Sequence, residues 1–197
     1  MQDQDIKSVH TEMVGDIALV CVDNPPVNAL SVHVRRGIQA AIADINAAGE
    51  AKVIVLYAAG RTFIAGADIT EFGKPPMAPA LPDLLNEMEQ SAIPVVCVLH
   101  GTALGGGLEV ALASHARVGI AGLRIGLPEV LIGLLPGAGG TQRVPRLAGI
   151  PAALDMSLSG RQVPAKEALS MGLLDALEEG DPRDVALKAG QDALDGK

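Results

Sequence analysis

Short apolar runs of strand length alternate along this chain with segments whose apolar residues recur at helical spacing. The runs lie at 14–22 (VGDIALVCV), 52–57 (KVIVLY) and 94–99 (PVVCVL) and are rich in β-branched residues. Between the first two, from Ser31 to Gly49, the apolar residues fall on one helical face, with a good N-cap before it and a glycine stop after it. Alternating strands and helices are typical of a layered domain. The pattern therefore predicts an α/β fold.

The remaining pattern extends this alternation to the end of the chain. Further helices are expected at 81–90, 106–114, 138–147, 152–159, 165–171 and 184–194, a helical turn at 68–72, and short strands at 117–120 and 123–126. The proline-rich segment 73–82 is expected to be a surface loop. No repeat and no break in composition divides the sequence, so residues 1–197 are expected to form one domain.

Charge and aromatic content argue against nucleic acid as a partner. The formal net charge is −8, and aromatic residues make up only 2% of the chain. A phosphate backbone would be repelled by this average charge, and there are too few aromatic side chains to stack on bases. A small anionic ligand stays compatible with the charge wherever a few Lys or Arg residues gather.

The cysteines, the polar N-terminal segment and the most apolar segment indicate where in the cell the protein is expected to be. Cys21 and Cys97 lie in apolar runs, where a thiol behaves as a small hydrophobic group, so a reduced cytoplasmic setting is expected. The polar N-terminal segment 1–10 does not resemble a secretion signal. The most apolar segment, 92–108, is interrupted by proline and glycines, so no membrane span is expected.

Several common catalytic and metal-binding motifs are absent from the sequence. There is no Walker loop, no G-x-S-x-G elbow and no H-E-x-x-H, and neither glycine-rich segment completes G-x-G-x-x-G. The four histidines (His10, His33, His100 and His115) are scattered without ligand spacing, so no metal site is expected.

Three glycines between a predicted strand and a predicted helix form the first candidate site. Gly105–Gly107 follow the run 94–99 and open the helix at 106–114. Glycine lets the backbone approach a ligand closely, and the first turn of a helix leaves N–H groups unpaired. These groups suit an anion or an oxyanion that develops during a reaction. Close packing of the helix against the strand explains the glycines equally well.

Two glutamates near this turn are candidates for proton transfer. Glu109 lies about one helical turn past Gly106, although a glutamate there also favours a helix start. Glu129 follows Pro128 within an apolar segment, so we expect its carboxyl to be partly buried and its pKa raised. Proline and glutamate in a first helical turn again have a purely structural explanation.

A third segment, GRTFIAGADI at 60–69, follows the strand at 52–57. Its Gly66-Ala67-Asp68 run is placed to present a second backbone N–H. The side chain of Asp68 is expected to cap the helical turn that follows.

Taken together, four segments resemble the enoyl-CoA hydratase/isomerase (crotonase) superfamily. They are PPVNALS, GRTFIAGADI, HGTALGGGLE and LPEVLIGLLPGAGGTQR, in family order and spacing from about Ile17 to Ala176. The residues of the last three segments are most similar to the N-terminal hydratase domain of multifunctional β-oxidation enzymes, in which a 3-hydroxyacyl-CoA dehydrogenase part follows. The resemblance implies a spiral of ββα units (the ClpP/crotonase fold).

The resemblance also implies a role for particular residues. It places the two oxyanion-hole N–H groups on Ala67 and Gly106, and the two hydratase glutamates on Glu109 and Glu129. The implied substrate-binding residues are Ala29, Leu30, Ala65, Gly66, Asp68, Ile69, Gly105, Pro128 and Gly137, of which the last is expected to help hold the reacting water. Arg61, Lys52 and Lys74 are candidates for the CoA phosphates, with exposed solubilising charge as the alternative.

The implied activity is hydration of 2-enoyl-CoA thioesters in fatty-acid β-oxidation, with 3,2-enoyl-CoA isomerisation as a second activity through Glu129. No cofactor is expected besides the CoA of the substrate. Alternatives are another acyl-CoA isomerase, a thioester hydrolase, or a non-catalytic acyl-CoA-binding domain. The chain stops where stand-alone members continue into covering helices, so the C-terminal helical region is expected to be truncated. The chain is then expected to form a homo-oligomer or to be fused to a 3-hydroxyacyl-CoA dehydrogenase part. A longer parent chain is also compatible with a peroxisomal location.

Overall fold

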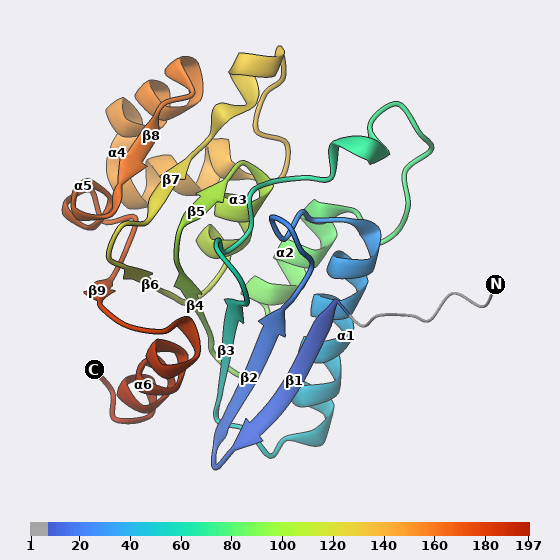
Figure 1. Cartoon of the computed structure of the whole chain (residues 1–197), viewed down its shortest axis with the longest axis vertical. Helices are drawn as coiled ribbons and strands as arrows, with labels where there is room; N and C mark the ends of the chain where they lie inside the picture. The colour runs from blue at the N-terminus through green and yellow to red at the C-terminus, as the bar shows by residue number, and fades with distance from the viewer. Residues whose placement is uncertain (1–7) are drawn as a thin grey trace.

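The computed structural model describes residues 8–197, which form two sheets covered by helices (Figure 1). The strands are β1 (Val9–Val14), β2 (Ile17–Val22), β3 (Val53–Ala58), β4 (Val95–Leu99), β5 (Thr102–Leu104), β6 (Ala116–Ile120), β7 (Arg124–Gly126), β8 (Gln162–Pro164) and β9 (Ala176–Glu178). The helices are α1 (Val32–Ala48), α2 (Leu81–Glu89), α3 (Gly106–Leu112), α4 (Gly140–Ser159), α5 (Ala165–Ser170) and α6 (Pro182–Leu194), with 3-10 turns η1 (Ile69–Glu71) and η2 (Pro128–Ile132). The predicted α/β class is confirmed.

The larger sheet determines where the candidate site lies. Its strand order is β1-β2-β3-β4-β6-β9, and every pair except the antiparallel β1–β2 is parallel. The carboxyl ends of parallel strands meet at one edge of a sheet. The segments that follow β2, β3 and β4 therefore emerge together, and they carry Leu30, Ala67 and Gly106. The second sheet, β5-β7-β8, lies beyond this edge (Figure 1).

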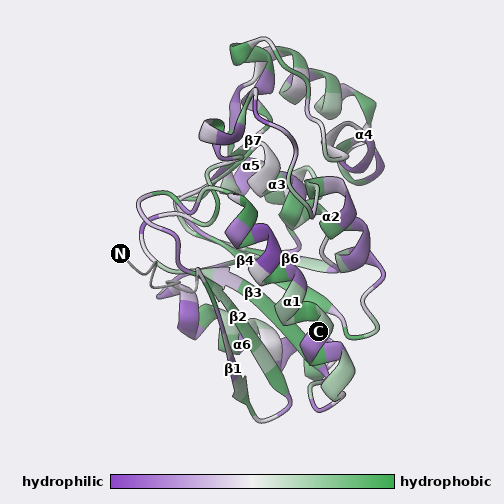
Figure 2. Cartoon of the chain, turned by 90° about the vertical axis from the view of Figure 1, so that its right-hand side faces the viewer, coloured by the Kyte–Doolittle hydropathy of each residue, from purple (hydrophilic) through white to green (hydrophobic). Residues whose placement is uncertain are grey.

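The central strands are apolar throughout because helices cover both faces of the sheet. Residues such as Val20 and Leu56 pack into the main core with α1, α2 and α3. Their neighbours Leu19 and Val55 point the other way and pack against α6. Alternation of side chains along a strand explains why both sets must be hydrophobic. Figure 2 shows this as continuous hydrophobic colour along β2, β3 and β4.

The first strand prediction is wrong in one respect. The run 14–22 is not one strand, because Gly15 adopts a left-handed conformation with φ of +58° and turns the chain into a hairpin. The run before the turn forms β1, whose side chains are mostly exposed. A polar edge strand lacks the apolar signal by which the buried strands were predicted. Most of the segment 1–10, where we expect no targeting signal, lies outside the described residues.

Helix predictions agree closely with the structure. Helix α1 begins after Ser31, whose Oγ accepts a hydrogen bond from Val34 N (3.4 Å), and ends at Gly49, which has φ of +66°. Helix α4 joins the two predicted helices at 138–147 and 152–159, with a non-helical Gly149 between them. Of the four three-residue strands, only β7 was predicted, at 123–126, whereas β5, β8 and β9 were not. Within residues 8–197, none of the helices is both long and apolar enough to span a membrane.

Candidate active site

Three loops at the carboxyl edge of the large sheet are bound to one another. Leu30 N donates to Gly66 O at 2.9 Å, which joins the loop after β2 to the loop after β3. Leu104 N donates to Ile64 O at 3.2 Å, which joins the latter to the segment after β4. Three of the motifs singled out in the sequence therefore meet at one place in the fold.

The two predicted oxyanion donors are neighbours in this cluster. A Cβ atom placed on Gly106 would lie 3.8 Å from Ala67 N and 2.9 Å from a methyl carbon of Leu81, so the Leu81 side chain would have to move to admit it. Within residues 8–197, neither the Ala67 N–H nor the Gly106 N–H donates to a protein acceptor. Two adjacent main-chain donors without acceptors are what an oxyanion-binding site requires.

Glu109 is held rigidly in the interior. It is only 2% exposed, and its Oε1 accepts hydrogen bonds from Ala138 N and Gly140 N, each at 2.8 Å. Glu109 does lie in the first turn of α3, so the electrostatic alternative considered from the sequence still holds, but its side-chain hydrogen bonds go elsewhere. They join α3 to the loop before α4 and to the first residue of α4, 29 and 31 residues further along the chain.

Glu129 lies in η2, directly after Pro128, and is half-buried as predicted. Its Oε1 lies against Gly105, where an added Cβ would come within 2.9 Å of it. Its Oε2 is buried and has no hydrogen-bond partner among the described residues. Burial raises the pKa of this carboxyl, and the negative charge of Glu109 raises it further. The predicted direction of the pKa shift is therefore confirmed.

Gly105 and Gly106 lie between the acidic side chain of Glu129 and the N–H group of Ala67. Gly105, with φ of +50°, lies against Glu129, and Gly106 lies against Ala67. The helix that these glycines open carries Glu109. Two acids and two free N–H groups thus surround the start of α3, and the close-packing explanation for the glycines holds alongside the functional one.

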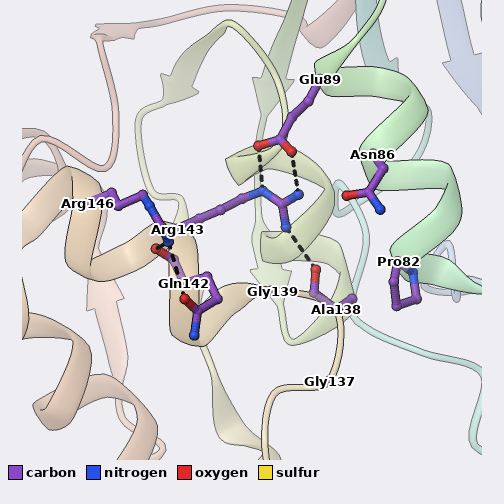
Figure 3. A pocket seen from close by; sticks show the side chains of 9 residues that line it. All are labelled: Pro82, Asn86, Glu89, Gly137, Ala138, Gly139, Gln142, Arg143 and Arg146. Carbon is purple, nitrogen blue, oxygen red and sulfur yellow. Dashed lines mark hydrogen bonds and ion pairs between the residues drawn. The ribbon is translucent and has the colours of Figure 1, made fainter.

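A cavity of about 430 Å³ adjoins the loop before α4, whose Ala138 N donates to Glu109 (Figure 3). It lies between α2 and the start of α4, and Gly137 is among its lining residues. Arg143 closes one side by donating to both carboxylate oxygens of Glu89 at 2.8 Å and to Ala138 O at 2.8 Å. This ion pair lowers the pKa of Glu89 and fixes the loop against α2.

Four of the remaining predicted site residues lie in the loops after β2 and β3. Ala29 and Ala65 are half-buried in the bound loops, where Ala65 N donates to Val27 O at 3.2 Å. Asp68 caps η1 by accepting from Thr70 N at 2.9 Å, as expected, and this bond lowers its pKa. Ile69 is 73% exposed. The substrate-binding role of these four residues stays a prediction.

Lys52 lies away from this cluster of loops, and its exposed side chain fits the alternative of solubilising charge. It precedes β3, so it lies at the amino edge of the sheet, and it pairs there with Asp16 at 2.6 Å. The site lies at the carboxyl edge. Arg61 and Lys74 lie in loops on the carboxyl side and are exposed, so their role stays a prediction.

Sequence reasoning missed two buried polar residues that hold the loops. Asn28 is 4% exposed and Thr62 is 7% exposed. Both stand inside motifs quoted above, but nothing local to either residue indicates its partners. A polar residue within an otherwise apolar motif is the only signal that the sequence offered.

A family model described as Enoyl-CoA hydratase/isomerase matches residues 12–188. The chain belongs to the enoyl-CoA hydratase/isomerase family. The family resemblance predicted from the four motifs is confirmed.

Similar proteins agree with this membership. The peroxisomal bifunctional enzyme of Danio rerio is 45% identical over 172 residues, covering 87% of this chain and 24% of that protein. The human peroxisomal bifunctional enzyme is 42% identical over 191 residues, covering 94% and 26%. A crystal structure of enoyl-CoA hydratase from Bacillus anthracis has a TM-score of 0.87 and 27% identity, covering 95% of this chain and 76% of that one.

The family members differ in length from this chain. It spans about a quarter of the length of the curated relatives it matches. The assignment of residues 1–197 to a single domain therefore stays a prediction.

Proposed function

We propose that the chain is an enoyl-CoA hydratase that adds water across the 2,3 double bond of 2-enoyl-CoA thioesters in fatty-acid β-oxidation. The observation that carries the proposal is the meeting of two acids and two free N–H groups around Gly105 and Gly106. Membership of the enoyl-CoA hydratase/isomerase family supports the substrate class. A relative from Arabidopsis thaliana that is 40% identical over 187 residues is named a peroxisomal fatty acid beta-oxidation multifunctional protein, which supports the place in β-oxidation.

The N–H groups of Ala67 and Gly106 bind the thioester carbonyl oxygen in this proposal. When water adds at Cβ, the electron pair of the double bond moves toward that oxygen and gives an enolate. Hydrogen bonds to the oxygen strengthen as its negative charge grows. Each such donor typically contributes about 10²–10³ in rate.

The two glutamates divide the proton transfers between them. Glu109 takes a proton from the water as the new C–O bond forms, and its Oε1 is already fixed by two N–H donors. Glu129, whose pKa is raised, is the group that carries a proton and gives it to Cα. Return of the proton from Glu109 to Glu129 through the next water restores the starting state.

Isomerisation of 3-enoyl-CoA to 2-enoyl-CoA is a second candidate activity. It needs one carboxyl group that removes a proton at one carbon and returns it two carbons away. Glu129 is suited to this because its Oε2 has no hydrogen-bond partner among the described residues. The double bond then moves without any addition of water.

The test is incubation of the chain with crotonyl-CoA and, separately, with 3-hexenoyl-CoA, followed by mass analysis of the products. Hydration gives a product heavier by one water, and isomerisation gives an unchanged mass with a conjugated spectrum. Release of free CoA would replace the proposal with a thioester hydrolase. Binding of crotonyl-CoA without any product would replace it with a non-catalytic acyl-CoA-binding domain.

We further propose that the reaction uses no cofactor besides the CoA of the substrate. The bifunctional names of the relatives support fusion to a second catalytic part, and self-association is the alternative. The relatives are named as peroxisomal proteins, and the cytoplasmic location expected from the sequence stays a proposal.

A further inference from the structure

The two oxyanion donors lie on different loops, so tertiary contacts alone set their separation. Ala67 belongs to the loop after β3, and Gly106 follows the short strand β5. Main-chain hydrogen bonds from Phe63 N to His100 O (2.9 Å) and from Leu104 N to Ile64 O (3.2 Å) hold the register of these segments. Two buried side chains add a second set of bonds.

Asn28 ties the loop after β2 to the loop that carries Ala67. Its Nδ2 donates to Ala59 O and to Thr62 O, each at 2.8 Å, and its Oδ1 accepts from Asn24 N at 2.8 Å. Both N–H bonds of the amide are therefore used. Asn28 has φ of +53°, a left-handed conformation that asparagine tolerates better than most residues.

Thr62 continues the connection to the segment that carries Gly106. Its Oγ1 accepts from Thr102 N at 3.0 Å and lies 2.7 Å from Thr102 O and 2.6 Å from Thr102 Oγ1. Thr102 begins β5, which leads directly to Gly105 and Gly106. A continuous chain of hydrogen bonds thus runs from buried Asn28 through buried Thr62 to half-buried Thr102.

We propose that Asn28 and Thr62 are positioning residues for catalysis, which fix the spacing of the Ala67 and Gly106 N–H groups around the thioester oxygen. The inference rests on the proposed function. Thr62 stands five residues before Ala67, and its partner Thr102 stands four residues before Gly106, so a shift between them moves one donor relative to the other. Misplacement by about 1 Å at a reacting centre costs about 10² in rate.

Matched variants separate this role from folding. Thr62→Val keeps the size and branching of the side chain but removes the hydroxyl, whereas Thr62→Ser keeps the hydroxyl. Asn28→Gly removes the amide while keeping a residue suited to positive φ. The variants are compared with the unmodified chain for kcat and KM with crotonyl-CoA and for thermal unfolding.

The decisive measurement is the absorption maximum of bound cinnamoyl-CoA. The absorption of this conjugated thioester moves to longer wavelength when hydrogen bonds polarise its carbonyl, so the shift reports the two donors directly. We expect Thr62→Val and Asn28→Gly to lower kcat by about tenfold or more, with KM changed by less than about threefold, and to reduce the shift. Thr62→Ser should restore kcat and the shift to near the unmodified values.

Other outcomes would overturn either the positioning role of Asn28 and Thr62 or the proposed hydratase function. If kcat and the absorption shift stay unchanged, or if kcat falls only in step with the folded fraction, the residues are structural and the inference is wrong. If Asn28→Gly does not fold, the Thr62→Val and Thr62→Ser pair decides alone. If the unmodified chain neither hydrates crotonyl-CoA nor shifts bound cinnamoyl-CoA, the proposed function itself fails.

Discussion

Replacement of Glu109 separates its role in chemistry from its role in folding. Its Oε1 accepts two buried N–H groups, from Ala138 and Gly140. Glutamine keeps an oxygen that can accept both bonds but cannot take a proton from water. Alanine removes the acceptor and leaves both N–H groups without a partner.

The expected magnitudes follow from these contacts. An unsatisfied buried donor costs about 1–3 kcal/mol, so Glu109→Ala should lower the free energy of unfolding by about 2–6 kcal/mol. Glu109→Gln should change it by less than about 1.5 kcal/mol, the net value of a typical hydrogen bond. Both variants should lower kcat by about 10²–10⁴, the usual contribution of a positioned base.

The assay pairs urea denaturation with the rate at which crotonyl-CoA loses its enoyl absorbance. A Glu109→Gln chain with the kcat of the unmodified chain would refute the assignment of Glu109 as a base. Equal stability of the Ala and Gln variants would refute the claim that Glu109 holds the loop before α4.

Three further predictions concern other parts of the chain. Glu129→Gln should abolish hydration. In the unmodified chain the raised pKa of Glu129 makes its ionisation unfavourable in the folded state, so the free energy of unfolding falls as the pH rises above about 4.3. The Gln variant should show a smaller fall. Gly107→Ala should destabilise the fold by about 1–3 kcal/mol or more in urea, since its Cβ would clash with the main-chain oxygen of Ile64. Gly137→Ala should not, because the nearest atom to its Cβ, Leu135 O, is 4.0 Å away. Lys52→Ala should leave KM for crotonyl-CoA unchanged in steady-state kinetics, because its exposed ion pair lies at the opposite edge of the sheet.

Each of these has an outcome that would contradict it. Parallel pH–stability curves for the Glu129→Gln chain and its parent would mean that ionisation of Glu129 does not oppose folding. Equal stability of the two glycine variants would mean that α3 is free to move away from the loop after β3. A several-fold rise in KM for Lys52→Ala would return that lysine to the CoA site.

The elements of the fold were largely predictable because their causes are local. Helix α1 is bounded by Ser31 and Gly49, and each acts on atoms within a few residues of itself. The strands β2, β3 and β4 are buried on both faces, which makes their apolar runs continuous. Strand β1 was missed because an exposed edge strand carries polar side chains and so has no apolar run.

The candidate site was predictable in its residue types but not in its contacts. The sequence by itself determined that two glutamates, a glycine triplet and an alanine stand in motifs typical of one family. Only the tertiary structure decided that Glu109 binds a loop 29 residues away and that Asn28 reaches Thr62, 34 residues away. It also decided that Lys52 lies at the amino ends of the strands, opposite the candidate site. The physical reason is the distance along the chain over which interactions act. Residues close in sequence set the local conformation of a side chain, whereas its hydrogen-bond partners and burial depend on which distant strands pair.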